Sequence, residues 1–246
     1  LGIASLYQGR ARAGVGLLRR SLDIGGPDVE AMAHLAWALA VSGNYLYVAD
    51  GVAGLRILNI ADPAAPVLAG AYYTVGPARA IALSGTTACL LDQQQGLLVL
   101  DVANPGAPSL LGTCTSFDAG QSLAVSGANA YVVDGNNHFF VVNIANPAAP
   151  TTIGSLLLAN KVGRALTLNG STAYVAAGED GLLAIDVATP SAPALASTIA
   201  TAGQAGALAL AGSKLYVANG FAGFQIFDLT SPHSPVFQAD LPTALR

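Results

Sequence analysis

Three aspartates recur along the sequence 42 residues apart, at Asp50, Asp92 and Asp134. Carboxylates that met at one point would bind Ca²⁺, which takes oxygen ligands at about 2.3–2.6 Å. Residues spaced this regularly belong to successive structural repeats, which hold them apart. Each aspartate also ends a short apolar run, where Asp accepts hydrogen bonds from the backbone of the turn that follows. We therefore expect turn caps and no metal site.

The stretches that follow these aspartates differ from one another more than the rest of the sequence does. Binding residues concentrate in such divergent loops on a regular scaffold. The candidate ligand-binding residues in these stretches are Gln94, Asn136, His138, Glu179 and Phe221.

A second recurring position lies six residues before a repeated glycine. It is occupied by Trp37, Arg79, Gln121, Arg164 and Gly206. Equivalent positions of successive repeats can surround the mouth of a channel through the centre of the molecule. If these do, two arginines there would hold an anionic group through bidentate hydrogen bonds. The alternative is that they solvate the channel entrance. Trp37, Arg79, Gln121 and Arg164 are therefore added to the candidate ligand-binding residues.

No motif in the sequence predicts catalysis. His34, His138 and His233 fall at unrelated positions, which argues against a shared metal site. The Gly-x-Ser-x-Gly nucleophile pattern, the phosphate-binding loop and the dinucleotide-binding glycine pattern are all absent from the sequence. We expect a non-enzymatic protein without a cofactor. The alternative is a small-molecule-binding or hydrolytic protein that uses Arg79, Arg164 and His138 at the channel mouth.

The elements that position these residues form an internal repeat. A small residue followed by glycine recurs at intervals of 42, 42, 43 and 42 residues, at Ser42-Gly43, Ser84-Gly85, Ser126-Gly127, Asn169-Gly170 and Ala211-Gly212. About twenty residues later each repeat carries two prolines in a short turn. These two-proline turns are Asp62–Pro66, Asn104–Pro108, Asn146–Pro150, Thr189–Pro193 and Ser231–Pro235.

Each repeat contains four short apolar runs separated by turn-forming residues. In the first repeat we predict strands over Ala38–Val41, Tyr45–Ala49, Leu55–Ile60 and Val67–Tyr73. Four strands in about 40–45 residues is typical of a β-propeller blade. The sequence therefore predicts an all-β protein, a β-propeller of five four-stranded blades over residues 37–246. Because successive strands run antiparallel, the two-proline turns should lie at the opposite edge of each blade from the divergent loops.

The third run of each repeat carries a family resemblance. It reads Gly-Leu-Arg-Ile-Leu-Asn-Ile over 54–60, and closely related runs span 96–102, 181–187 and 223–229, whereas the third repeat has His138-Phe139 in place of Gly-Leu. Together with the two-proline turn, this pattern resembles the LVIVD repeat of bacterial and archaeal surface propellers. The resemblance covers Trp37 to about Ala239. It implies an extracellular or cell-surface protein and says almost nothing about function.

Residues 1–36 do not carry the repeat cleanly. Their Arg, Leu and Ala content favours a helical segment, and the stretch from Gly9 to Ile24 weakly resembles the second helix of a tetratricopeptide repeat. The alternative is a degenerate first blade, which would give six blades in all.

Composition limits the partners that this protein can have. Charged residues make up 10% of the chain and its formal net charge is −4, so it offers no basic surface for nucleic acid. No apolar run approaches the ~18 residues that a membrane-spanning helix needs. We expect a cell-surface or secreted scaffold that binds another protein or a surface component, with no membrane insertion of this segment.

The two cysteines, Cys89 and Cys114, fall in the second and fourth strands predicted for the second repeat. Two strands separated by a third lie about 9.5 Å apart, whereas a disulfide needs Cα atoms within about 7 Å. We therefore predict two buried free thiols.

Overall fold

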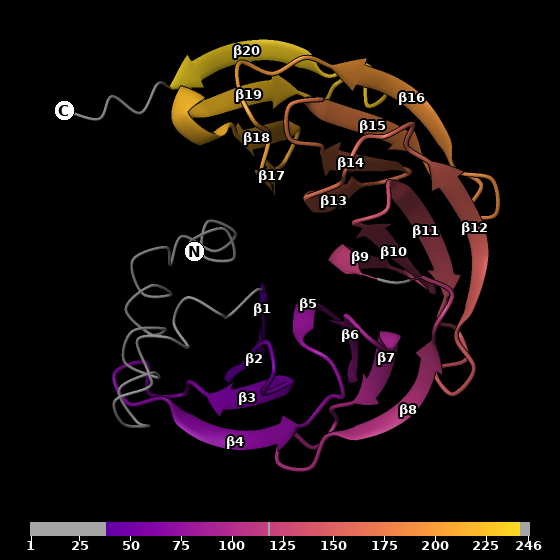
Figure 1. Cartoon of the computed structure of the whole chain (residues 1–246). Coiled ribbons are helices and arrows are strands. Elements are labelled where there is room, and N and C mark those ends of the chain that lie inside the picture. Colours follow the sequence, from indigo (N-terminus) through magenta and orange to yellow (C-terminus); the bar gives the residue numbers. More distant parts are fainter. Residues whose placement is uncertain (1–37, 118, 242–246) are drawn as a thin grey trace. The chain divides into compact units, whose positions relative to one another are not determined.

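The structure, a computed structural model, describes residues 38–117 and 119–241. These residues form twenty strands in five antiparallel four-stranded sheets, each built in the sequence order of its strands (Figure 1). The expected all-β propeller of five blades is therefore confirmed. Trp37 and the segment 1–36, with the helix and the sixth blade weighed for it, lie outside the described residues.

Blades one and two take up the first two repeats. Blade one consists of β1 (Ala38–Ser42), β2 (Tyr45–Ala49), β3 (Leu55–Asn59) and β4 (Val67–Tyr72). Blade two consists of β5 (Ala78–Ser84), β6 (Thr87–Asp92), β7 (Gly96–Asp101) and β8 (Ser109–Cys114). The strands of blade one end within one residue of the predicted bounds.

The other three repeats form one blade each. Blade three consists of β9 (Gly120–Ser126), β10 (Asn129–Asp134), β11 (His138–Asn143) and β12 (Thr151–Leu157). Blade four consists of β13 (Ala165–Asn169), β14 (Thr172–Ala176), β15 (Leu182–Asp186) and β16 (Ala194–Ile199). Blade five consists of β17 (Ala207–Ala211), β18 (Lys214–Ala218), β19 (Phe224–Asp228) and β20 (Val236–Leu241). A 3₁₀ turn, η1 (Gly220–Ala222), joins β18 to β19. The sequence analysis does not predict this turn.

The described residues fall into two compact units. Unit one holds the described residues up to Gly120 together with Ile144–Pro150, and unit two holds Gln121–Asn143 and the described residues from Thr151. In each unit the core lies between the faces of successive blades. In unit one it joins blade one to blade two, and in unit two it joins blade three to four and four to five.

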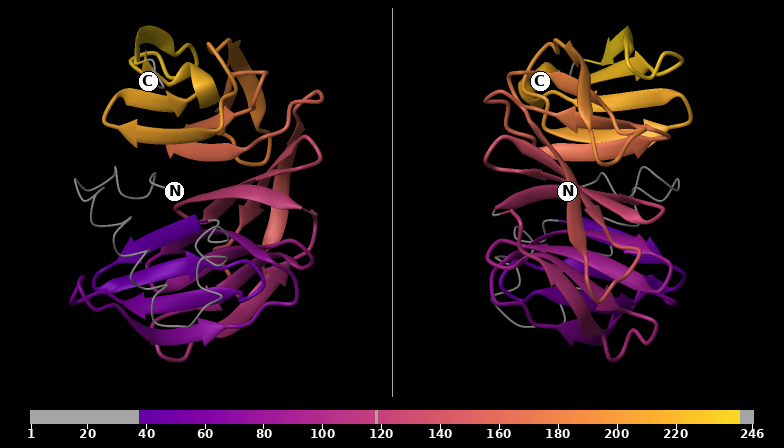
Figure 2. Two further views of the ribbon diagram at one scale, coloured as in Figure 1. Left: turned by 60° about the vertical axis from the view of Figure 1, so that its left-hand side comes forward. Right: turned by 90° about the vertical axis from the view of Figure 1, so that its right-hand side faces the viewer.

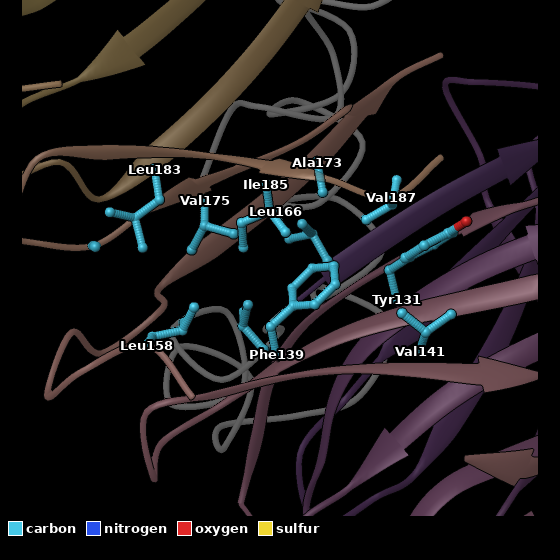
Figure 3. Close-up of a cluster of buried hydrophobic side chains, with 12 residues drawn as sticks. Tyr131, Phe139, Val141, Leu158, Leu166, Ala173, Val175, Leu183, Ile185 and Val187 are labelled. Carbon is cyan, nitrogen blue, oxygen red and sulfur yellow. The ribbon is translucent and has the colours of Figure 1, made fainter. Parts of the chain in front are cut away.

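The cores consist of the alternating apolar side chains of the second and third strands. Between blades three and four, Phe139 on β11 packs with Leu183 and Ile185 on β15 in a cluster of buried apolar side chains (Figure 3). The rings of Tyr131 and Phe139 lie 6.1 Å apart in this cluster. Every residue of β14 is buried, because both faces of blade four are covered.

Antiparallel pairing gives each blade two distinct edges (Figure 2). We call one the loop edge: it carries the loop between the second and third strands and the connection that leaves the fourth strand. We call the other the turn edge: it carries the first hairpin and the two-proline turn. In every blade the two-proline turn therefore lies opposite the divergent loop, as the sequence predicts.

Candidate functional site

Buried aspartates anchor the loops of blades two and three. Asp92 Oδ1 accepts hydrogen bonds of 2.7 Å from the N–H groups of Gln94 and Gln95. Asp134 Oδ1 accepts from the N–H groups of Asn136 and His138, at 2.9 and 2.8 Å. The turn caps expected at Asp92 and Asp134 are confirmed. The cap expected at Asp50 is wrong, because its carboxylate accepts a hydrogen bond from Arg56 instead. Among the described residues no group of three or more His, Cys, Asp or Glu side chains is placed to hold a metal ion.

The same position works differently in blades one and five. In blade one, Arg56 Nη1 lies 3.2 Å from Asp50 Oδ2, and burial nevertheless raises the pKa of the Asp50 carboxyl. In blade five, the Nδ2 of buried Asn219 donates to Gln225 Oε1 at 2.9 Å. The loop then forms η1 instead of folding back onto the Asn219 side chain. In both blades the buried side chain at this position therefore pairs with a polar side chain on the third strand. In blades two and three it accepts hydrogen bonds from the backbone of the loop instead.

The two candidate arginines occupy matching positions near the loop edges of blades two and four. Arg79 on β5 is half-buried, and this burial lowers the pKa of its guanidinium. Arg164 is exposed and lies over the loop that follows β14, since a Cβ on Gly178 would stand 2.9 Å from its Nε. Gln121 is half-buried on β9. A channel mouth would be formed by residues of both units. The prediction that these side chains surround such a mouth therefore stays a prediction.

The candidate loop residues all lie at loop edges, and Gln94, Asn136 and Glu179 are exposed there. Glu179 Oε1 accepts a hydrogen bond of 3.0 Å from Gln204 Nε2, which joins the loop of blade four to the connection entering blade five. His138 stacks on Phe140, with ring centroids 5.5 Å apart, and its Nδ1 lies 3.8 Å from Asp134 Oδ2. Phe221 in η1 is 95% exposed.

Exposed apolar side chains at the loop edges of unit one were missed by sequence reasoning. Val52 is 81% exposed in the loop after β2, and Tyr73 and Val75, in the connection from blade one to blade two, are 80% and 71% exposed. These segments adjoin: Gly51 pairs with Ala78 in an isolated bridge. The sequence hardly indicates that these side chains are exposed, because its pattern places Tyr73 at the end of a predicted strand.

Unit two carries comparable side chains at its loop edges. Leu157 at the end of β12 and Val162 in the connection to blade four are both exposed, as is Phe221. Each unit therefore presents large apolar side chains beside exposed polar ones at its loop edges.

Comparison with known families decides the family of this chain. The model of the LVIVD repeat matches five times, over residues 35–74, 75–116, 119–157, 164–201 and 202–243. The chain belongs to the LVIVD repeat family. No curated protein matches its sequence.

Solved structures resemble this LVIVD repeat protein in fold. A putative 6-phosphogluconolactonase from Bacteroides uniformis is 16% identical with a TM-score of 0.71, and the match covers 86% of this chain and 73% of that one. The Cps50 (Swd1) β-propeller domain of Myceliophteria thermophila is 12% identical with a TM-score of 0.65, covering 85% and 72%. The computationally designed Ika8 protein is 12% identical with a TM-score of 0.66, covering 84% of this chain and 64% of its own. At these identities the likeness shows the fold alone.

The glycine that opens the third strand of the LVIVD repeat has a steric role. Gly54, Gly96 and Gly181 adopt φ of +75° to +80°, and a Cβ at each would stand 2.3–2.4 Å from a carbonyl oxygen at the end of the fourth strand. In blade three, where His138 replaces this glycine, the positive φ of 66° passes to Asn137. Asn tolerates this conformation better than most residues.

In the part of the chain that the structure describes, no helix is long and apolar enough to cross a membrane.

Proposed function

We propose that this LVIVD repeat protein is a non-enzymatic interaction module that binds another protein or a surface component through the loop edges of its blades. The main support is the group formed by Val52, Tyr73 and Val75, three large apolar side chains that are at least 71% exposed on adjoining segments. Exposed apolar groups of this kind mark interaction sites, and aromatic residues such as Tyr often carry much of the binding energy.

Anchoring of the loops supports the same proposal. Gly76 N–H donates to Asp92 Oδ2 at 2.8 Å, and Val75 N–H donates to Gln95 Oε1 at 3.3 Å. These bonds hold the connection that carries Tyr73 and Val75 against the loop of blade two. A surface that is ordered before binding loses less conformational entropy when its partner binds. The family resemblance supports a cell-surface or extracellular location.

The alternative, small-molecule binding or hydrolysis with Arg79, Arg164 and His138, has weaker support. The 3.8 Å between His138 Nδ1 and Asp134 Oδ2 exceeds hydrogen-bond length, so this carboxylate does not orient the imidazole as a base-activating partner would. One structural neighbour is named as a putative 6-phosphogluconolactonase, and that likeness shows fold alone.

The experiment is a binding comparison between loop-edge and turn-edge variants. The full chain is immobilised, partners are captured from the source organism, and the affinity of the purified partner is measured for Tyr73→Ser, Val75→Ser and Val67→Ser. Val67 is a matched control, since it is also an exposed apolar side chain, 62% exposed, but lies at the turn edge of blade one. We expect Tyr73→Ser to weaken binding about tenfold or more, and Val67→Ser to leave it unchanged. Equal affinity for all three variants would refute a loop-edge site, and a thermal shift with a small-molecule panel tests the alternative.

A further inference from the structure

Two Asn-Gly pairs occur in the sequence, Asn169-Gly170 and Asn219-Gly220. An asparagine that precedes glycine is especially prone to lose its side-chain amide. Glycine has no side chain to hinder attack of its backbone nitrogen on the neighbouring amide carbon, and its backbone adopts the conformations that the attack needs. Both pairs belong to unit two, but the structure holds them in very different surroundings.

Asn169-Gly170 lies in the hairpin between β13 and β14 of blade four. The last pair of this ladder is Asn169 with Thr172, so Gly170 and Ser171 form a two-residue loop whose N–H groups lie outside the ladder. A Cβ added at Gly170 would meet no heavy atom within 4 Å. Gly170 and Ser171 are exposed and Asn169 is partly exposed, so solvent reaches the groups that would react.

The hairpin turn does not require asparagine at this position. The residue before the turn glycine is Ser42, Ser84 and Ser126 in blades one to three and Ala211 in blade five. The glycines of these four turns adopt φ of +56° to +58°, and Gly170 adopts +57°. The same turn therefore forms without an amide side chain, and a serine in place of Asn169 should keep it.

The second pair, Asn219-Gly220, is held by hydrogen bonds at a buried position. Asn219 is 1% exposed, and its Nδ2 donates to Gln225 Oε1 at 2.9 Å. Its backbone N–H donates to the oxygen of Gly223 at 2.8 Å, and its backbone oxygen accepts from the N–H of Ala222 at 3.1 Å. The Asn219 amide can react only after these bonds open, and buried segments open rarely.

We propose that Asn169 is a site of spontaneous deamidation and that the fold protects Asn219 from the same reaction. The backbone nitrogen of Gly170 gives its proton to solvent and bonds to Cγ of Asn169. The bond from Cγ to Nδ2 breaks, and Nδ2 leaves as ammonia, so a five-membered succinimide ring forms. One water molecule then opens the ring at either carbonyl, which gives aspartate or isoaspartate. The reaction consumes this water and needs no other reactant.

Both products change the turn edge of blade four. Each replaces a neutral amide by a carboxylate, and isoaspartate also lengthens the backbone by one methylene group. Because Asn169 belongs to the last pair of the β13–β14 ladder, the longer backbone disturbs that pair. The hairpin lies at the opposite edge of the blade from the divergent loop, so this proposal does not depend on the proposed function.

The test follows the two asparagines in the purified full chain during storage at mildly alkaline pH. Trypsin cleaves after Arg164 and Lys214, so the two asparagines fall on separate fragments, 165–214 and 215–246. Mass spectrometry of each fragment measures how much amide has become carboxyl and at which residue. In the folded protein we expect Asn169 to react at least about tenfold faster than Asn219. In concentrated urea, where the fold no longer protects Asn219, the two should react at similar rates.

The matched control is Asn169→Ser, since serine stands at this position in blades one to three. Its fragment 165–214 should keep its mass, and circular dichroism checks that the variant folds. An Asn169 that stays intact in the folded wild type but reacts in urea overturns the proposal, because the hairpin would then protect its amide. Equal rates at Asn169 and Asn219 in the folded protein overturn it as well, because burial would then give Asn219 no protection.

Discussion

The carboxylate of Asp92 accepts a 2.8 Å hydrogen bond from the backbone N–H of Gly76, which lies in the connection between blades one and two. Its other oxygen accepts from Gln94 and Gln95, so one buried side chain holds two loop-edge segments together. Replacing Asp92 by Ala would leave three N–H groups without this acceptor. The surface that carries Tyr73 and Val75 therefore depends on a side chain that is itself buried.

We predict that Asp92→Ala lowers the free energy of unfolding by about 2–4 kcal/mol, because hydrogen bonds to a buried charged group are strong and their unpaired donors are costly. For a chain of this size the melting temperature should fall by roughly 5–12 °C, measured by calorimetry. Asp101→Ala is the control, since Asp101 makes a single exposed bond to the N–H of Ala103. Equal melting temperatures for the two variants would contradict the role given to Asp92.

A second prediction concerns the close contact at Gly112. A Cβ there would lie 2.5 Å from the oxygen of Pro147 and 2.8 Å from the backbone of Ala148, so Gly112→Ala forces the two segments apart. We expect a loss of about 1–3 kcal/mol in a urea titration. At Gly106 the nearest atom to an added Cβ is 3.4 Å away, and Gly106→Ala should leave the midpoint nearly unchanged. A Gly112→Ala chain as stable as Gly106→Ala would show that the junction adapts freely.

The repeat explains why the blades could be predicted from the sequence. Turn glycines and paired prolines recur at fixed intervals, and each copy of the pattern repeats the same strand assignment. The aspartate caps could be predicted for the same reason, since Asp92 and Asp134 end their second strands at the same position. The periodicity of the sequence therefore predicts the features that all repeats share, which are the strands and turns that position the site.

The same reasoning misses what makes one copy different. Tyr73 reads as strand because its neighbours are apolar, yet β4 ends at Tyr72 and the next side chain faces solvent. Gly70, Gly112 and Gly154 also look like ordinary strand residues until the two-proline turn of the next blade is placed against them. The contacts at these glycines join residues 35 or 36 positions apart, and local pattern carries no information on such contacts.

The third prediction is a pH dependence that arises at Asp50. Burial raises the pKa of this carboxyl above its ordinary value of about 3.9, so the folded protein holds a proton that the unfolded chain has already released. This contribution is fully present below pH ~3.9 and is lost as the pH rises through the folded pKa. We therefore expect Asp50→Asn to gain stability relative to the wild type over that window and to hold a constant difference above it. Melting curves from pH 3.5 to 8 measure the difference, and a difference that does not vary with pH would contradict the prediction.

The last prediction concerns the two thiols, which form no disulfide and are buried, as the sequence predicts. Cys89 on β6 and Cys114 on β8 are separated by β7 within their sheet, so their strands are not neighbours. Burial raises the pKa of the Cys89 thiol to about 12. The thiolate is the reactive form, so at pH 8 about one Cys89 in ten thousand is reactive in the folded state.

A thiol reagent should therefore count two cysteines in denatured protein without reductant and react slowly with the native protein. In Cys114→Ser, which leaves Cys89 alone, raising the pH from 7 to 9 should still give slow labelling, because both values lie far below the folded pKa. Denaturation should restore fast reaction, since the unfolded thiol titrates near pH 8.5. Fast labelling of native Cys114→Ser at pH 8 would show that blade two opens readily at β6. A count of zero from denatured monomeric protein would mean that the strand order β5-β6-β7-β8 is wrong.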